Sequence, residues 1–423
     1  MWVGKNGASP VRTTSSALRT LVRFGYHRAP FGYHGNVIVQ KSYKFRMDPT
    51  REQEQCFVHF AGCRRWLWNW ALSRKQETYK ATGKGIYAKS LCQELTALRR
   101  ELPWLAECQA QLLQQTLRDL DKAFRAFFKK RSRFPRFKSR KHSPPAFRFA
   151  QFARVEEGCV VLPKIGWVKA RLHRPMEGVV KSATIKQESD GHWYVVFVSH
   201  VEIPDVAPAC DRPCGIDVGL SSFLTLDSGA KVSPPKFYRR GQRKLRRLQR
   251  QLSRCQKTSR NRAKAKARVA HQHSHIANRR NDFLHKLSHG LVARYDTLCV
   301  EDLNLSALVR TKLRGHSKSW MDAALGNFLR MLEYKSLWNS GQVVEVGRWF
   351  PSSRTCHCCQ RIQHLELSDR QWTCASCGAV HDRDHNAAIN ILTEGLRLLA
   401  VGSTDNSTAS GESISPATAG RSR

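Results

Sequence analysis

The sequence predicts a multidomain α+β protein, in which a mixed α/β domain with an inserted cysteine motif follows a small β-barrel that carries a helical insertion. Three observations lead to this prediction. After residue 209, apolar strands that run into acids alternate with amphipathic helices. Two C-x-x-C pairs interrupt that pattern near the C-terminus. Between residues 147 and 204, short strands recur between turn residues.

The β-barrel domain is expected over residues 39–49 and 131–208. Its first strand, SYKFRM, follows Lys41 and stops at Asp48-Pro49-Thr50. The last two of its later strands flank the turn Ser189-Asp190-Gly191 and predict a hairpin. The later strands are VVLP, WVKARLH, SATIKQE and HWYVVFVSHVEI.

The helical insertion is expected over residues 50–130. Apolar side chains keep helical spacing from about Thr50, and further helices are predicted from about Ala88 to Glu101 and from about Leu105 to Lys130. Tryptophans accompany arginines on these helices, an arrangement that either stacks nucleic-acid bases or fills the core. The N-terminal residues 1–38 have no core period and are expected to be either a disordered extension or an over-long start of the reading frame. The Ser/Thr-rich tail 401–423 is also expected to be disordered.

The connector Arg131 to Phe149 combines seven Lys or Arg with four Phe and three Pro. Its prolines exclude a helix interior. Such a segment either lies along a nucleic-acid backbone or is a plain linker.

The mixed α/β domain is expected over residues 209–350 and 379–400. Its elements follow the order strand, strand, strand, helices, strand, helix, strand, insertion, helix. This order predicts an RNase H-like fold. Within it, Arg310 to Ser319 is expected to be a basic loop, and one helix is expected from Trp320 to about Gly341.

Three acids in this domain are candidate catalytic residues. Asp217 lies in an apolar strand, Glu301 ends another, and Asp384 begins a helix. Asp384 shares a helix face with the apolar residues three, four, seven and eight positions later, so either an arginine or a metal ion must neutralise it. Three converging carboxylates suit catalytic Mg²⁺, and a pair of ions could hydrolyse a phosphodiester. Singly, Asp217 is also explained as a turn acid and Glu301 as a strand-end acid, and the acids most easily confused with the set are Asp302 and Asp382.

The segment 351–378 is expected to be a zinc ribbon. Its two C-x-x-C pairs are separated by fourteen residues, a spacing at which four thiolates close on one structural Zn²⁺. The alternatives are unpaired thiols or two disulfides. The four predicted zinc ligands are Cys356, Cys359, Cys374 and Cys377, with Cys358 as a bystander.

The charge predicts a polyanionic partner. Lys and Arg number 72 against 33 Asp and Glu, a net charge of +39. Such one-sided charge favours nucleic-acid binding, with anionic lipid as the alternative. No apolar run is long enough to cross a membrane and no signal peptide is recognised, so a cytoplasmic, nucleoid-associated protein is expected.

The chain resembles the TnpB family of bacterial and archaeal insertion sequences over roughly Lys41 to Ala400. The matching motifs are KFRMDPTREQ, FPRFK, GIDVGL, VEDLNL, LEYKSLW, RWFPSSRTC, CASCG and DRDHNAAINIL. The resemblance implies an RNA-guided endonuclease similar to compact type V CRISPR nucleases, with a RuvC domain that cuts DNA. It implies that the barrel, as a wedge domain, and the helical insertion bind guide RNA and target DNA. It also implies that the three acids are catalytic and that the four cysteines bind zinc.

The sequence therefore predicts an RNA-guided, Mg²⁺-dependent DNA endonuclease, with a separate transposase of the same element as a further partner. Two alternatives stay open. A non-catalytic regulator of a separate transposase would not need the acids, and an autonomous transposase would use the same acids to join strands.

Overall fold

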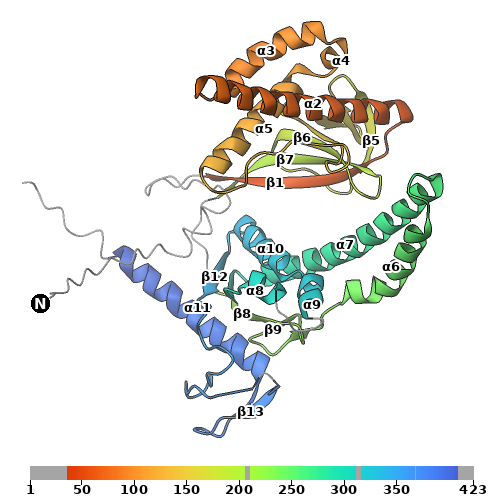
Figure 1. Cartoon of the computed structure of the whole chain (residues 1–423). Helices are drawn as coiled ribbons and strands as arrows, with labels where there is room; N and C mark the ends of the chain where they lie inside the picture. The colour runs from red at the N-terminus through yellow and green to blue at the C-terminus, as the bar shows by residue number, and fades with distance from the viewer. Residues whose placement is uncertain (1–35, 205–209, 311–315, 367, 408–423) are drawn as a thin grey trace, which may run out of the picture. The chain divides into compact units, whose positions relative to one another are not determined.

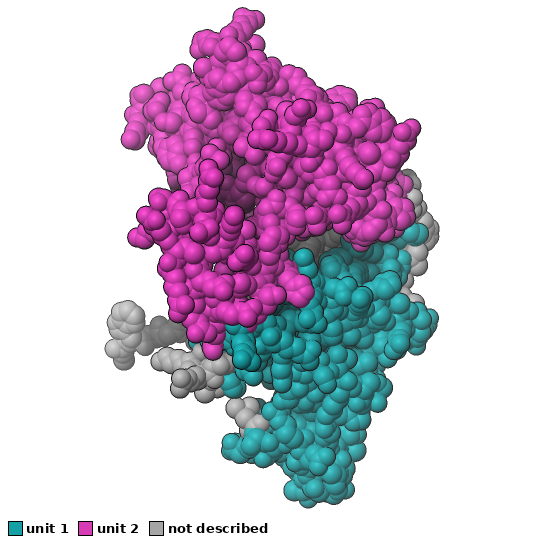
Figure 2. Space-filling model, turned by 90° about the vertical axis from the view of Figure 1, so that its right-hand side faces the viewer, with its two compact units in different colours: residues 1–37, 203–243, 276–423 teal, residues 38–202, 244–275 magenta. Residues whose placement is uncertain are grey.

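The computed structural model describes residues 36–204, 210–310, 316–366 and 368–407. Figure 1 shows its elements, and Figure 2 colours the two compact units into which the chain divides. One unit contains residues 38–202 and 244–275, and the other contains the described parts of 1–37, 203–243 and 276–423. The predicted α+β class is confirmed, since each unit combines a sheet with helices.

The first unit contains a seven-stranded sheet with the order β2-β6-β7-β1-β5-β4-β3. Side chains of β7 alternate between buried and partly buried over most of the strand, which is the period of a sheet with one face on the core. Strand β1 begins at Asn36, before the predicted start at Lys41. The strands are β1 (Asn36–Met47), β2 (Ala146–Phe149), β3 (Arg154–Glu156), β4 (Cys159–Leu162), β5 (Gly166–Arg171), β6 (Val179–Gln187) and β7 (Trp193–Pro204).

Four helices lie between β1 and β2 in the sequence: α2 (Arg51–Thr82), α3 (Ala88–Glu101), α4 (Pro103–Ala106) and α5 (Ala110–Phe128). Helix α2 starts with a capping box between Thr50 and Gln53. The single helix predicted from Leu105 to Lys130 is instead two helices. Arg99 donates to the carbonyls of Ala106 and Cys108, which replaces helical hydrogen bonds at the break.

The second unit contains a five-stranded mixed sheet with the order β10-β9-β8-β11-β12. Strands β8, β11 and β12 are parallel, and β9 and β10 continue the sheet with antiparallel pairings. The strands are β8 (Pro213–Val218), β9 (Leu224–Leu226), β10 (Lys231–Val232), β11 (Thr297–Glu301) and β12 (Gln342–Val346). The carboxyl ends of the three parallel strands therefore lie at one edge of the sheet.

The helices after β10 are α6 (Phe237–Arg254), α7 (Arg260–Arg294), α8 (Leu305–Val309), α9 (His316–Ala323), α10 (Leu325–Trp338) and α11 (Arg383–Ser407). Two predictions need correction. Helix α9 begins inside the predicted basic loop Arg310–Ser319, of which residues 311–315 lie outside the described part. The helix predicted from Trp320 is divided at Ala324, whose φ of 53° is left-handed and cannot continue an α-helix.

Both predicted disordered ends lie mainly outside the described residues, which exclude 1–35 and 408–423. Helix α11 continues to Ser407, beyond the predicted start of the tail at Val401. No described helix is long and apolar enough to cross a membrane.

Helix α11 packs directly on the sheet, at positions where only glycine leaves room. A Cβ at Gly215 of β8 would lie 2.1 Å from the carbonyl oxygen of Ala388, and a Cβ at Gly395 would lie 2.4 Å from the sulfur of Cys299 on β11. The helix therefore crosses the two strands that carry Asp217 and Glu301.

Candidate active site and metal centre

Asp217 and Glu301 come from neighbouring parallel strands. The register of β8 and β11 pairs Cys299 with Gly215 and Val300 with Ile216, so the next residue on each strand is one of the two acids. The flanking residues Ile216 and Val300 are buried apolar side chains that fix the strands in the core. The sheet thus brings both carboxylates to its carboxyl edge.

Asp384 reaches the same edge from helix α11. The residues three, four and seven positions later, Ala387, Ala388 and Ile391, are fully buried, as the predicted helix face requires. Asp382 precedes the helix and accepts a hydrogen bond from the backbone N–H of His385 at 3.0 Å, which makes it the N-cap. Asp384 therefore lies on the side that packs over the sheet, with 20% of its side chain exposed.

The charges of the three acids act on one another. Burial, then the charges of Asp384 and Glu301, raise the pKa of Asp217 to about 7, while Arg383 opposes the rise. Burial, then the charge of Asp302, also raises the pKa of Glu301. Burial and repulsion between neighbouring carboxylates therefore act in the same direction on both acids.

Two neighbouring acids differ from these three, because cations already pair with them. Asp302 accepts from Arg348 at 2.8 Å, and Asp382 accepts from Lys231 at 2.6 Å. Asp384 has a looser partner: an Nη of Arg370 lies 3.8 Å from its Oδ1. The sequence analysis allowed for an arginine at Asp384 but did not identify Arg370.

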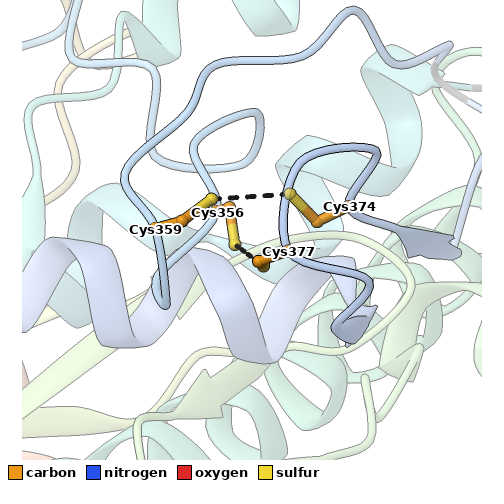
Figure 3. Close-up of side chains that lie close together, drawn as sticks. All are labelled: Cys356, Cys359, Cys374 and Cys377. Carbon is orange, nitrogen blue, oxygen red and sulfur yellow. Dashed lines mark hydrogen bonds between the residues drawn. The ribbon is translucent and has the colours of Figure 1, made fainter.

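The four predicted zinc ligands form a compact cluster. Figure 3 shows their side chains pointing toward one another. The sulfurs of Cys356 and Cys377 are 3.7 Å apart, those of Cys359 and Cys374 are 3.6 Å apart, and all four lie within 4.8 Å of one another. A tetrahedron with Zn–S bonds of about 2.3 Å has sulfurs roughly 3.8 Å apart, whereas a disulfide requires about 2.05 Å. All four cysteines are free thiols, so the arrangement fits Zn²⁺ and not two disulfides.

A second ligand set shares one of these cysteines. Cys356, Cys358 and His381 also lie within 4.8 Å of one another, and His381 Nε2 is 3.1 Å from the sulfur of Cys356. Cys358 is exposed, in contrast to buried Cys356. The set offers three ligands where structural zinc takes four, and thus the four-cysteine cluster fits the ion better.

The three acids are less compact than the cysteines, since they are not among the described groups whose ligand atoms lie within 4.8 Å of one another. Uncompensated carboxylates repel one another. Their donor set still fits Mg²⁺, because all three ligands are carboxylate oxygens, and burial followed by the charges of the other two acids raises the pKa of Asp217, which a bound cation would offset.

Two buried asparagines join the cysteine segment to the helix of Asp384. Asn386 and Asn390 are each 1% exposed, and the Nδ2 of each donates to the carbonyls of Ser352 and Thr355. Asn386 also accepts from the backbone N–H of His357 at 3.0 Å. The sequence analysis missed this pair, although two asparagines four residues apart on the buried helix face were its signal.

The residues just before strand β13 contact the start of the same helix. Strands β13 (Gln371–Thr373) and β14 (Val380–Asp382) pair antiparallel and lead into α11. The Nη1 of Arg383 donates to the carbonyl of Glu366, and its backbone N–H donates to the carbonyl of Arg370. The cysteine cluster and the first turn of α11 thus form one connected piece.

Family models match three segments of the chain. The OrfB_IS605 family, described as "Probable transposase", matches residues 200–312, and "Cas12f1-like, TNB domain" matches residues 326–391. A family described as "Helix-turn-helix domain" matches residues 38–84, where the structure has strand β1 and the single helix α2.

Two relatives cover most of the chain. A Streptomyces pristinaespiralis protein named "Putative RNA-guided DNA endonuclease" is 38% identical over 371 residues, which are 86% of this chain and 91% of that protein. The Escherichia coli (strain K12) protein named "Putative RNA-guided DNA endonuclease InsQ" is 35% identical over 380 residues, covering 86% of this chain and 94% of that protein.

Among solved structures, the following one is similar in fold. It is described as "Cryo-EM structure of the Cas12f1-sgRNA-target DNA complex" and has a TM-score of 0.53 at 12% identity, covering 84% of this chain and 98% of that one.

Proposed function

The chain belongs to the TnpB family of insertion-sequence proteins, and we propose that it is an RNA-guided, Mg²⁺-dependent DNA endonuclease. The observation that carries the proposal is the convergence of Asp217, Glu301 and Asp384 at one edge of the mixed sheet. The relatives' names supply the reaction class, and the acids supply a site for it.

In this proposal the mixed sheet is the core of an RNase H-like, RuvC-type nuclease domain over residues 209–350 and 379–400. Its strand order, with three parallel strands followed by two antiparallel ones, supports the assignment. The seven-stranded sheet corresponds to a wedge domain over residues 39–49 and 131–208, and the helices of residues 50–130 are its recognition insertion. The segment 351–378 is a zinc ribbon.

Asp217, Glu301 and Asp384 would hold the catalytic Mg²⁺. When bound, the ion supplies a Lewis acid for a phosphodiester and neutralises the carboxylates. The chain's own residues provide the rest: parallel strands fix two of the carboxylates, and α11 presents the third. Buried side chains around Asp217 exclude water and thereby strengthen its interaction with any cation.

Cys356, Cys359, Cys374 and Cys377 would hold a structural Zn²⁺. Four thiolates leave no open coordination position, so we assign the ion no part in the chemistry. Its role is to fix the segment that Asn386 and Asn390 fasten to α11, and with it the start of the helix.

The partners follow from charge and family. A net charge of +39 favours phosphate binding, and the relatives' names specify RNA guidance and DNA cleavage. We therefore propose a guide RNA and a target DNA as ligands, with a separate transposase of the same element as a further partner.

The test is programmed cleavage. RNA that copurifies with the protein is sequenced, its guide segment is replaced, and a plasmid library containing the new target beside random flanking sequence is incubated with Mg²⁺. We expect cuts that move with the guide and require Mg²⁺. Cleavage that ignores the guide, or no cleavage of any library member, would contradict the proposal.

Strand joining is the second candidate, since the matching family is described as "Probable transposase" and the same three acids could serve it. Labelled element ends added to the same reaction distinguish the two functions. Joined products would favour a transposase, and hydrolysed ends alone would favour the endonuclease.

A further inference from the structure

The basic connector after α5, residues 131–142, is held in place along α2 although it has no regular secondary structure; we call it the basic strap. Asn69 on α2 makes two backbone hydrogen bonds with Lys138, donating to its carbonyl at 2.8 Å and accepting from its N–H at 2.7 Å. The indole of Trp68 donates to the carbonyl of Arg136 at 3.0 Å. These bonds replace the ladder that a helix or sheet would supply.

Side chains fix the strap as well. The Lys138 ammonium lies 3.6 Å from the centroid of the Trp68 ring, a cation–π contact. The ring of Phe134 packs edge-on against Phe124 and Phe127 of α5, with centroids 5.5 and 5.3 Å apart. Burial and the neighbouring Arg64 lower the pKa of Lys138 to about 8, while Asp119 opposes the change.

The outer side of the strap is exposed, cationic and without acidic partners. Among the described residues, no carboxylate lies within ion-pair distance of its five exposed cations: Arg131, Arg133, Arg136, Arg140 and Lys141. The sequence has no acid between Asp121 and Glu156. Phe137 lies among these cations with 56% of its surface exposed.

A plain linker would need neither the hydrogen bonds to α2 nor the exposed row of unpaired cations. Holding a run of like charges in one conformation loses conformational entropy and keeps the charges in mutual repulsion. Nothing in the described part of the free protein offsets these two costs. Closely spaced cations with an exposed aromatic ring between them suit a single strand of nucleic acid, because its phosphates bind cations and its unpaired bases stack on aromatic rings.

We propose that the basic strap is a binding site for single-stranded RNA, with its arginines on successive phosphates and Phe137 stacked on one unpaired base. The clamp by Trp68 and Asn69 presents these groups in advance and so lowers the entropic cost of binding. The choice of RNA over DNA rests on the proposed function, whereas the choice of a single strand rests on the strap itself.

The test uses the full chain, stripped of copurified nucleic acid, and a fluorescein-labelled 20-nucleotide oligouridylate whose binding is followed by anisotropy across a salt series. The variant R131Q/R133Q/R136Q should lower the slope of log K against log salt by about 2, since each phosphate contact in a single strand contributes roughly 0.7. The matched control K286Q/R294Q/K318Q removes three exposed cations of α7 and α9, outside the wedge and recognition segments, and should leave the slope nearly unchanged.

Two further variants measure what the Phe137 ring and the hydrogen bonds of Asn69 contribute to RNA binding, separately from charge. Phe137→Ala should weaken binding roughly tenfold, the loss of one stacked base, with the slope unchanged. Asn69→Ala keeps every charge but frees the strap, and should also weaken binding. The substituted side chains lie on or beneath the exposed strap, so each variant should melt at nearly the temperature of the wild type. Such a result excludes unfolding as the cause of weaker binding.

Three outcomes would overturn the proposal: equal slopes for the strap and control variants, wild-type affinity in both Phe137→Ala and Asn69→Ala, or equal competition by duplex DNA of the same length. Binding is measured without cleavage, so the two proposals fail separately. A wild type that binds through the strap but never cuts DNA refutes only the endonuclease. Strap variants that bind and cut normally refute only the strap.

Discussion

Asp217 and Glu301 occupy equivalent positions on two neighbouring parallel strands, each one residue beyond the Ile216–Val300 pair. Neither carboxylate has a described ion-pair partner within 4.0 Å, whereas adjacent Asp302 and Asp382 do. Placing two acids side by side at a buried strand end costs stability, and Asp384 increases that cost. Such an arrangement is typical of functional sites.

The first prediction concerns the pH dependence of stability. Burial and the neighbouring acids raise the pKa of Asp217 from 3.8 to about 7, so the folded protein binds this proton more tightly than the unfolded chain does. The resulting stability is complete below pH about 4 and is lost as the pH rises to about 7. At pH 8 without divalent cations, Asp217→Asn should therefore be more stable than the wild type, by at most about 4 kcal/mol.

Thermal melts at pH 5 and pH 8 check this prediction. The advantage of Asp217→Asn should shrink at the lower pH, and Mg²⁺ should raise the melting temperature of the wild type much more than that of the variant. A variant that is less stable at pH 8 would show that Asp217 is a structural acid.

The second prediction concerns the contact between α11 and β8. Gly215→Ala places a methyl group 2.1 Å from the Ala388 carbonyl oxygen and 2.8 Å from Leu392, so the helix must move. We expect a loss of at least about 3 kcal/mol in urea unfolding. The control Gly290→Ala adds a methyl group to a helix position with no atom within 4 Å, and should be neutral or slightly stabilising.

The third prediction concerns the two asparagines. Because each donates to both Ser352 and Thr355, either one alone still satisfies the two carbonyls. Each single alanine variant should cost about 1 kcal/mol, and the double variant should cost more than the sum. Asn386→Ala should be the costlier single change, since Asn386 also holds the N–H of His357. Additive losses in a double-mutant cycle would contradict this shared role.

The fourth prediction concerns the metal of the cysteine cluster. Elemental analysis should find one zinc per chain in the wild type and in Cys358→Ser, and none in Cys374→Ser, because only the latter breaks the four-sulfur set. Retention of zinc in Cys374→Ser together with its loss in Cys358→Ser would instead assign the ion to Cys356, Cys358 and His381.

The sequence was informative wherever local patterns determine the structure. The apolar runs around Asp217 and Glu301 predicted strands, and the face of Asp384, Ala387 and Ile391 predicted how α11 packs, because both patterns follow from burial of one face. The break at Ala324 had no signal in that residue, since alanine favours a continuous helix, whereas its φ of 53° is left-handed.

The candidate site was predicted less completely. Asn386, Asn390 and Arg370 act through partners that are close only in the folded chain: the Ser352 and Thr355 carbonyls and the Asp384 carboxylate. Spacing within one element cannot reveal such partners. The acids were easier to find, because a carboxylate in an apolar segment is unusual by itself.

The most direct measurement compares the DNA cleavage rates of Asp217→Asn and Asp302→Asn with the wild type, using one guide RNA, one target and saturating Mg²⁺. Both variants remove one negative charge from neighbouring positions at the same sheet edge, and a binding assay on the same samples checks that RNA and DNA are still held. The proposed site predicts that Asp217→Asn loses at least a thousandfold in rate with nucleic-acid binding intact, the order expected for removal of a catalytic group, while Asp302→Asn stays within about tenfold of the wild type. Wild-type cleavage by Asp217→Asn would contradict the assignment of the three acids as the catalytic site.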